Sequence, residues 1–210
     1  MNLTSLKKDF AESFSLSFHP LFIPFYTLMF IFVLPIFQVQ TLGRAMQLSI
    51  LIIVSLSTII LPLGSLFYLK KKKVISSIKI PNRSERTTPY VYTIIYFAAA
   101  AFMLYRIDFI PLLIPIVLII PAVVISLLLI FNFWIKISAH AAGMGSLNAI
   151  IYVLMHVYYL DLAIAFNISL LLAFIIIISR KYLKSHSYLE LILGYSVGGI
   201  VSLIISFWAL

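Results

Sequence analysis

Long apolar stretches separated by short polar interruptions run along almost the whole chain. Seven of them approach the ~20 residues needed to cross the hydrocarbon core of a bilayer; they are 20–37, 45–69, 89–105, 109–134, 141–160, 162–179 and 187–209. Helices satisfy their own backbone hydrogen bonds in lipid, so these stretches predict helices rather than strands. We therefore expect an all-α, polytopic transmembrane bundle of six to seven spans, forming a single domain over residues 20–210.

Residues 1–19 show a different pattern. Their apolar residues recur at spacings of three and four, with charged residues between them: Leu3, Leu6, Phe10, Phe14 and Phe18 alternate with Lys7, Lys8, Asp9 and Glu12. This pattern is typical of a helix that lies in the headgroup region, and a frayed polar tail is the alternative. The segment lacks the uninterrupted apolar core of a cleavable signal peptide.

Composition agrees with a membrane protein. The chain is 63% hydrophobic and 10% charged, with a mean hydropathy of +1.16, which leaves too little polar surface to cover a soluble domain. The net charge of +9 lies mostly in loops, where it indicates membrane topology and anionic lipid rather than nucleic acid. The absence of cysteine excludes disulfides and thiolate metal sites.

Three polar islands interrupt the apolar pattern, at 79–89, 137–140 and 179–190. An even number of predicted spans separates each pair, so all three are expected on one membrane face. Every Lys and Arg except Arg44 and Arg106 belongs to that face. The positive-inside rule then predicts that this face is cytoplasmic.

The third island contains a potential nucleophile. His186 and Glu190 are four residues apart, hence on one face of a helix. A carboxylate that accepts the Nδ1 proton orients an imidazole and raises the basicity of its other nitrogen. Arg180 carries a planar guanidinium that can bind two phosphoryl oxygens. The alternative interpretation is an interfacial cluster that anchors two helix ends among lipid headgroups.

The other two islands offer phosphate ligands and an acid. Ser138 is a hydroxyl donor and His140 is a candidate general acid, unless they form only a capped helix start with an interfacial histidine. Lys79 and Arg86 can neutralise a phosphate, unless they belong to an ordinary basic loop. No cluster of His and carboxylate residues in the sequence has the spacing typical of metal ligands.

Taken in order, the islands resemble the type 2 phosphatidic acid phosphatase superfamily, whose fold is shared with vanadium haloperoxidases. That family carries the motifs K-x6-R-P, P-S-G-H and S-R-x5-H-x3-D. The chain keeps both cations of the first motif, the Ser and His of the second, and S-R-x5-H of the third. The departures are Thr87 and Ile137 for two prolines, Ala139 for a glycine and Glu190 for the aspartate.

This resemblance implies a membrane enzyme that hydrolyses a lipid phosphate without metal or other cofactor, in a bacterial inner membrane. His186 would be the nucleophile that forms a phosphohistidine, Glu190 would orient it, and His140 would protonate the leaving group. The phosphate would be held by Lys79, Arg86, Ser138 and Arg180.

Two alternatives belong to other functional classes. An inactive relative that binds lipid headgroups or scaffolds membrane proteins is favoured by the altered first and second motifs. A transporter is disfavoured, because the ionisable residues cluster at span ends rather than mid-span. Outside the islands, we expect His156 and Asp161 to form a structural interfacial pair, and His19 to lie at the interface beside Pro20.

Overall fold

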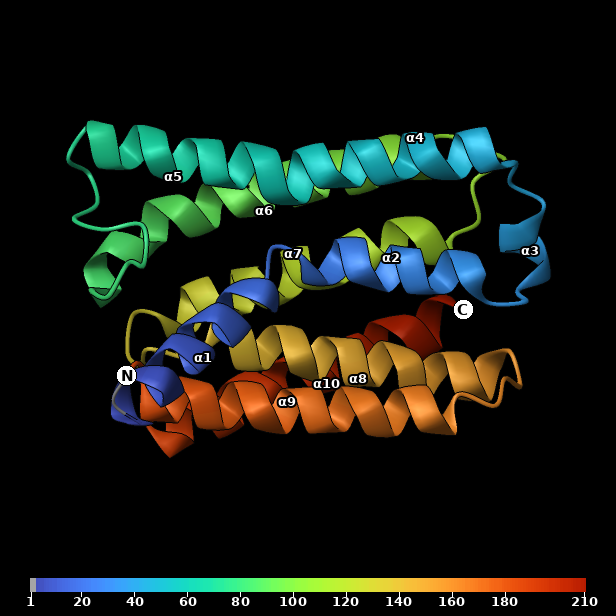
Figure 1. The fold of residues 1–210 in the computed structure, drawn as a ribbon. Helices are drawn as coiled ribbons and strands as arrows, with labels where there is room; N and C mark the ends of the chain where they lie inside the picture. The colour runs from blue at the N-terminus through green and yellow to red at the C-terminus, as the bar shows by residue number, and fades with distance from the viewer. Residues whose placement is uncertain (1–2) are drawn as a thin grey trace.

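Long helices run side by side along one axis in the computed structural model, which describes residues 3–210 (Figure 1). No strand occurs within that range. The elements are α1 (Leu3–Ser17), α2 (Ile23–Val33), α3 (Phe37–Gln40), α4 (Arg44–Ser55), the π-helical turn η1 (Leu56–Ile60), α5 (Leu61–Lys71), the 3-10 turn η2 (Arg83–Arg86), α6 (Thr87–Tyr105), α7 (Leu113–Phe131), α8 (Ala139–Val157), α9 (Ala163–Tyr182) and α10 (Tyr188–Ala209).

Five helical segments of the described chain are long and apolar enough to cross a membrane. They are Arg44–Lys71, Arg83–Tyr105, Leu113–Phe131, Ala163–Tyr182 and Tyr188–Ala209. The protein is therefore a helical integral membrane protein, as the hydropathy pattern predicts. α8 has 19 residues but is not among these five segments, and its buried positions include the polar Ser146 and Asn148.

The stretch 20–37 forms a shorter helix than expected. Its helix α2 has 11 residues, a length of about 16 Å at 1.5 Å per residue, which is roughly half of a ~30 Å hydrocarbon core. The helix ends where Leu34 becomes extended, because the residue before a proline disfavours the helical conformation. Spanning length was the wrong expectation for this stretch.

The second apolar stretch accommodates Pro62 by a local change of helix type. The π-helical turn Leu56–Ile60 directly precedes α5, in which Pro62 occupies the first turn. A proline lacks the backbone N–H that closes an α-helical turn, and a π-bulge is one of the usual ways in which a helix absorbs such a defect. The result is one continuous helical segment from Arg44 to Lys71.

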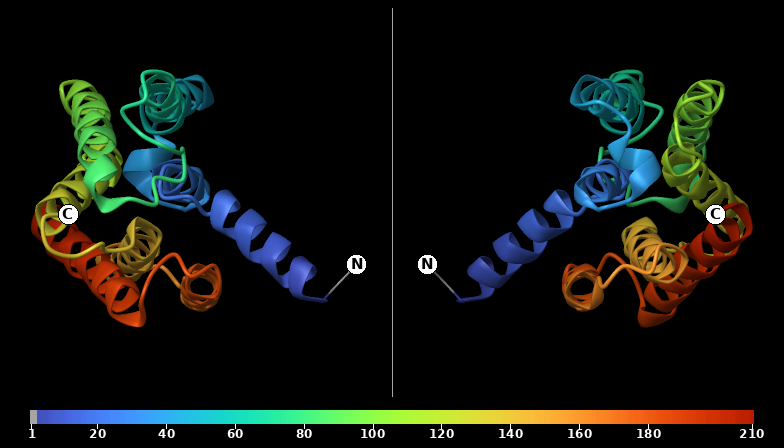
Figure 2. Two further views of the ribbon diagram at one scale, coloured as in Figure 1. Left: turned by 90° about the vertical axis from the view of Figure 1, so that its left-hand side faces the viewer. Right: turned by 90° about the vertical axis from the view of Figure 1, so that its right-hand side faces the viewer.

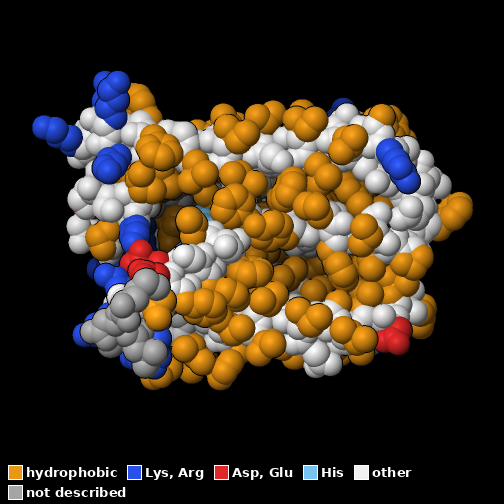
Figure 3. All heavy atoms as spheres, in the orientation of Figure 1, with side chains coloured by type: hydrophobic (Ala, Val, Ile, Leu, Met, Phe, Trp, Pro, Cys, Tyr) orange, Lys and Arg blue, Asp and Glu red, His pale blue; other side chains and the backbone are white. Residues whose placement is uncertain are grey.

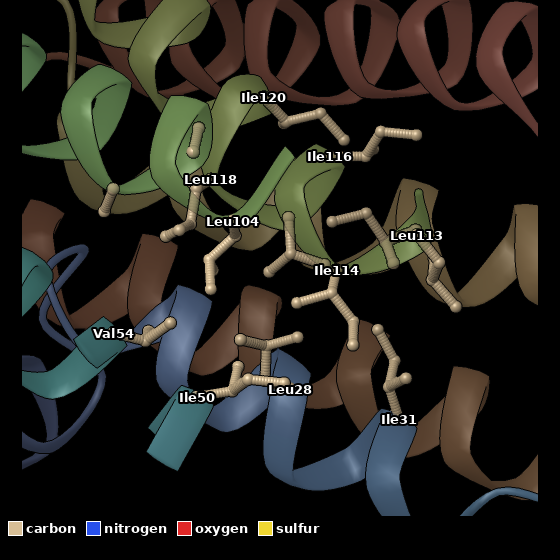
Figure 4. Packing of buried hydrophobic residues seen from close by; sticks show 14 of the residues in the cluster. Leu28, Ile31, Ile50, Val54, Leu104, Leu113, Ile114, Ile116, Leu118 and Ile120 are labelled. Atoms are coloured by element: carbon tan, nitrogen blue, oxygen red, sulfur yellow. The ribbon is translucent and has the colours of Figure 1, made fainter. Parts of the chain in front are cut away.

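The short helix α2 lies in the middle of the bundle. Its Leu28 and Ile31 have no exposed surface and pack against α4, α6 and α7 (Figure 4). The other labelled members of the same buried cluster are Ile50, Val54, Leu104, Leu113, Ile114 and Leu118, together with Ile116 and Ile120, which point away from α2 on the other side of α7. α2 thus fills the core between longer helices.

Helices α8 and α10 approach each other unusually closely. A Cβ added at Gly198 would overlap the carbonyl oxygen of Ala142, and one added at Gly194 would lie 2.5 Å from the carbonyl oxygen of Ser138. The missing side chains let the two backbones meet. At the end of this contact the Ser138 amide donates to the Glu190 carbonyl, 3.1 Å away.

The N-terminal segment forms helix α1, as its apolar spacing predicts, and is not a frayed tail over the described residues. Residues 1 and 2 lie outside the described range. Viewed along the bundle axis, α1 extends sideways away from the long helices (Figure 2), and it packs against α9. Phe14 and Phe18 pack against a buried cluster, whereas Phe10 is 60% exposed. Figure 1 shows that α1 also advances along the bundle axis, so it is inclined to the long helices.

Candidate functional site

The three polar islands meet at one end of the bundle, where Lys and Arg side chains also gather (Figure 3). Arg86, at the end of η2, is 8% exposed and extends its Nη1 to within 3.4 Å of the Ile137 carbonyl oxygen. The first island therefore contacts the second directly. The close crossing of α8 and α10 joins the second to the third. This convergence agrees with the prediction that all three islands lie on one membrane face.

His186 sits in the turn between α9 and α10 with a defined tautomer. Its Nδ1 lies 2.9 Å from Glu190 Oε2 and 3.1 Å from the Lys136 carbonyl oxygen. Both partners only accept hydrogen bonds, so Nδ1 carries the proton. The neutral ring consequently keeps a free lone pair on Nε2, which is what a nucleophile requires.

Glu190 is positioned by the start of its own helix. The Ser187 amide donates to Glu190 Oε2 at 3.1 Å, and the Glu190 amide donates to Ser187 Oγ at 3.3 Å. This is a capping box, which fixes the carboxylate one turn into α10. The same Oε2 atom also meets His186, so the longer arm of glutamate reaches the histidine without strain on the helix start.

The cations of the site influence the titration of their neighbours. Burial, supported by the charges of Arg86 and Arg180, lowers the pKa of His186 to about 4 and outweighs the opposing hydrogen bond that His186 donates to Glu190. Burial also lowers the pKa of Lys136, and the charge of Arg86 lowers it further. His186 is therefore neutral, and able to act as a nucleophile, at neutral pH.

Arg180 contributes an unused donor. It lies in the last turn of α9, and its buried Nε has no hydrogen-bond partner among the described residues. A buried guanidinium N–H without a partner costs free energy. An anion held between Arg180 and Arg86 would remove that cost.

Ser138 and Lys79 occupy less direct positions than predicted. Ser138 is fully buried as the N-cap of α8, where its Oγ accepts from the Ala141 amide at 3.4 Å. Lys79 is exposed at the rim, with Nζ 3.0 Å from Glu12 Oε2 on α1. The structure thus brings Arg86, Arg180 and His186 together, whereas Ser138 is buried in the start of α8 and Lys79 lies exposed at the rim.

His140 lies in the first turn of α8, and its ring contacts the N-terminal segment. Its Nε2 donates to the Ser15 carbonyl oxygen at 3.1 Å. Its ring meets His19 edge to face, with 5.0 Å between the ring centroids and 82° between the planes. His19, expected at the interface beside Pro20, also belongs to this cluster, because the turn after α1 lies against α8, where Pro20 approaches Gly143.

A cavity of about 1290 Å³ extends from this polar end into the apolar interior. Figure 3 shows a hollow on this face, next to the basic end. Arg86, His140, Arg180 and His186 line its polar part, and its apolar wall includes side chains from α5 and α7 (Leu63, Leu66, Val117, Ile120, Pro121 and Val124). The volume exceeds the ~300–1,000 Å³ of ordinary small-molecule pockets.

Sequence reasoning did not assign Lys136 and His19 to the site, although both line this cavity. Lys136 stands two residues before Ser138, so proximity to the motif could have identified it. His19 has no such signal, because only the tertiary fold of α1 brings it close. His156 and Asp161 do not pair with each other: His156 Nδ1 donates to the Tyr152 carbonyl at 2.8 Å, and Asp161 accepts from the Ala163 amide at 3.3 Å.

The buried histidines predict acid sensitivity of the fold. Burial lowers the pKa of His19 and of His186 to about 4, against about 6.5 in the unfolded chain. Between these values the unfolded state binds more protons, so the free energy of unfolding falls as the pH decreases from about 6.5 to about 4. Thermal unfolding in detergent between pH 7.5 and 4 should show this loss. The double variant H19Q/H186Q should lose less stability over the same pH interval. The same pH dependence in the variant and the wild type would contradict the attribution of this loss to His19 and His186.

No protein-family model, curated protein or solved structure matches the chain. Within residues 3–210, no group of three or more His, Cys, Asp or Glu side chains lies where it could hold a metal ion. The chemistry of this site is therefore inferred from its own residues.

Proposed function

We propose that the protein is an integral membrane phosphatase that hydrolyses a phosphate monoester or pyrophosphate on a lipid headgroup. The observation that carries this proposal is the hydrogen bond between His186 Nδ1 and Glu190 Oε2, which leaves Nε2 free at the head of a cavity lined by Arg86 and Arg180. The apolar part of the same cavity suits the hydrocarbon chain of such a substrate.

The proposed reaction has two steps. His186 Nε2 attacks phosphorus, the bond to the leaving oxygen breaks, and that oxygen takes a proton from an acid of the site, for which His140 is the candidate from the motif. Water then attacks the phosphohistidine, the N–P bond breaks and phosphate leaves. Arg86 and Arg180 neutralise the charge that spreads over the phosphoryl oxygens, while Glu190 stabilises the Nδ1–H of the ring.

The finer details of fold and location belong to the same proposal. We assign the bundle to the phosphatidic acid phosphatase type, with crossings formed by the α4–α5 segment, α6, α7, α8, α9 and α10. The turn after α1 and helix α2 lead the chain from the site's end to the opposite end, where α4 begins. α2 packs within it as a half-length helix. The excess of Lys and Arg at the site's end favours a cytoplasmic site in a bacterial inner membrane.

Phosphate release from lipid phosphates tests the proposal. Purified protein in nanodiscs is expected to release phosphate from at least one of phosphatidic acid, phosphatidylglycerol phosphate and a polyprenyl pyrophosphate. EDTA should change the rate little, because arginines rather than a metal supply the positive charge. Failure to release phosphate from any of them, or a strict requirement for a divalent cation, would contradict the proposal.

A second candidate is an inactive relative that binds lipid headgroups or scaffolds other membrane proteins. Two contacts favour it: Glu12 neutralises Lys79, and the Ser15 carbonyl occupies the Nε2–H of His140. This candidate predicts that vesicles containing phosphatidic acid bind the protein without phosphate release, and that binding survives His186→Gln.

A further inference from the structure

The N-terminal segment contributes side chains to the site that none of the three polar islands includes. Glu12 pairs with Lys79 at 3.0 Å, and the carbonyl of Ser15 accepts from His140 at 3.1 Å. His19, in the turn between α1 and α2, places its ring against His140 and lines the cavity. The segment thus forms one wall of the polar end, and its imidazole faces the same cavity as His186.

The hydrogen bonds of the two imidazoles assign their tautomers. The Leu21 amide donates to His19 Nδ1 at 3.3 Å, so the neutral ring of His19 carries its proton on Nε2. His140 uses its Nε2–H on a backbone carbonyl, and its Nδ1 is then unprotonated. Among the described residues no hydrogen bond engages the His19 Nε2–H, so His19 is the imidazole of the pair whose proton is free.

The charges around His19 suit a proton donor that is active only with substrate bound. Burial and, to a smaller extent, the positive charge of Arg180 together lower the pKa of His19 to about 4. A phosphate held by Arg180 would offset that charge and favour the protonated ring. Binding of the substrate would thereby increase the fraction of His19 rings that are protonated, beside the leaving group of the substrate.

We propose that His19 is a further catalytic residue of this site, the group that donates a proton to the leaving oxygen. This inference rests on the proposed phosphatase function. The acid is the imidazolium form of His19, in which Nδ1 also carries a proton and no longer accepts from the Leu21 amide. As His186 Nε2 forms its bond to phosphorus, the P–O bond of the leaving group breaks, the Nε2 proton of this imidazolium passes to the departing oxygen, and a neutral ring protonated on Nδ1 remains. In the second step, the attacking water returns a proton to His19 Nε2. His140 then acts as a positioning residue that holds α1 through Ser15 and packs on the His19 ring.

Leaving groups of different acidity distinguish this role from a structural one. His19→Gln keeps a polar side chain but cannot transfer a proton, and His19→Asn keeps an acceptor near the Leu21 amide. We expect both variants to hydrolyse a long-chain alkyl phosphate about 100-fold more slowly than the wild type. With an aryl phosphate of matched chain length, whose phenol leaves without protonation, the loss should be about threefold or less.

His156→Gln, at the far end of α8, is the matched control and should leave both rates unchanged. If each His19 variant hydrolyses the alkyl and the aryl phosphate with the same loss of rate, or hydrolyses both at the wild-type rate, the proton-donor role of His19 is overturned. The proposed phosphatase function is not affected by that result. A wild-type protein that hydrolyses neither substrate would instead overturn the proposed function, and the catalytic role of His19 with it. A variant that misfolds is recognised by its thermal unfolding, and the other variant then decides.

Discussion

His186→Gln is expected to reduce phosphate release from the best lipid phosphate by on the order of 10³-fold or more. Glutamine preserves much of the volume and polarity of the side chain but has no nitrogen lone pair that can form a phosphohistidine. His186 is only 7% exposed and is held by Glu190 and the Lys136 carbonyl, so the loss reports on a single, fixed side chain. Steady-state phosphate release in nanodiscs measures the loss.

Glu190→Gln should also give a large loss, of about 10²–10⁴-fold, because an amide can present an N–H to His186 and favour the wrong tautomer. His156→Gln, whose ring bonds only within its own helix, should match the wild type. Acid quenching after brief reaction with a labelled substrate should trap phosphohistidine in the wild type and none in His186→Gln. Turnover retained by His186→Gln would exclude the proposed mechanism.

The apolar pattern predicts most of the helices, because a span must be helical wherever lipid surrounds it. The pattern fails where tertiary packing decides. Residues 20–37 read as a span, yet Pro35 ends α2 early and the core around Leu28 and Ile31 holds it.

The site is predictable to the extent that its geometry is local. The pairing of His186 with Glu190 follows from a spacing of one helical turn and is present at 2.9 Å. The capping role of Ser138 also follows from its position before a helix. The pairing of Lys79 with Glu12 and the packing of His19 on His140 join segments far apart in the chain, so spacing could not reveal them.

One tertiary contact links the fold to the site. The crossing of α8 and α10 sets the distance between the second and third islands, since the Ser138 amide and the Glu190 carbonyl meet at its end. Separation of the two helices would therefore move Glu190, and with it His186, relative to Arg86 and Lys136. Small residues at the crossing are consequently a requirement of the site as well as of the fold.

Gly198→Ala should accordingly destabilise the protein by about 3 kcal/mol or more and reduce activity in the surviving folded fraction. The new Cβ would overlap the Ala142 carbonyl oxygen and lie 2.9 Å from the Ala142 Cα. Both are backbone atoms, so no side-chain rotation relieves the clash and α8 must move away. The free energy of unfolding in mixed micelles, together with phosphate release, measures the two effects.

Gly199→Ala provides the matched control on the same helix. Its added Cβ would meet only the Gly145 carbonyl oxygen at 3.7 Å, an ordinary van der Waals contact. Alanine also favours a helix relative to glycine by up to ~1 kcal/mol, so this variant should be as stable as the wild type or slightly more so. Equal stability of Gly198→Ala and Gly199→Ala would contradict the close crossing. A folded Gly198→Ala protein with full activity would show that the site tolerates displacement of α8 from α10.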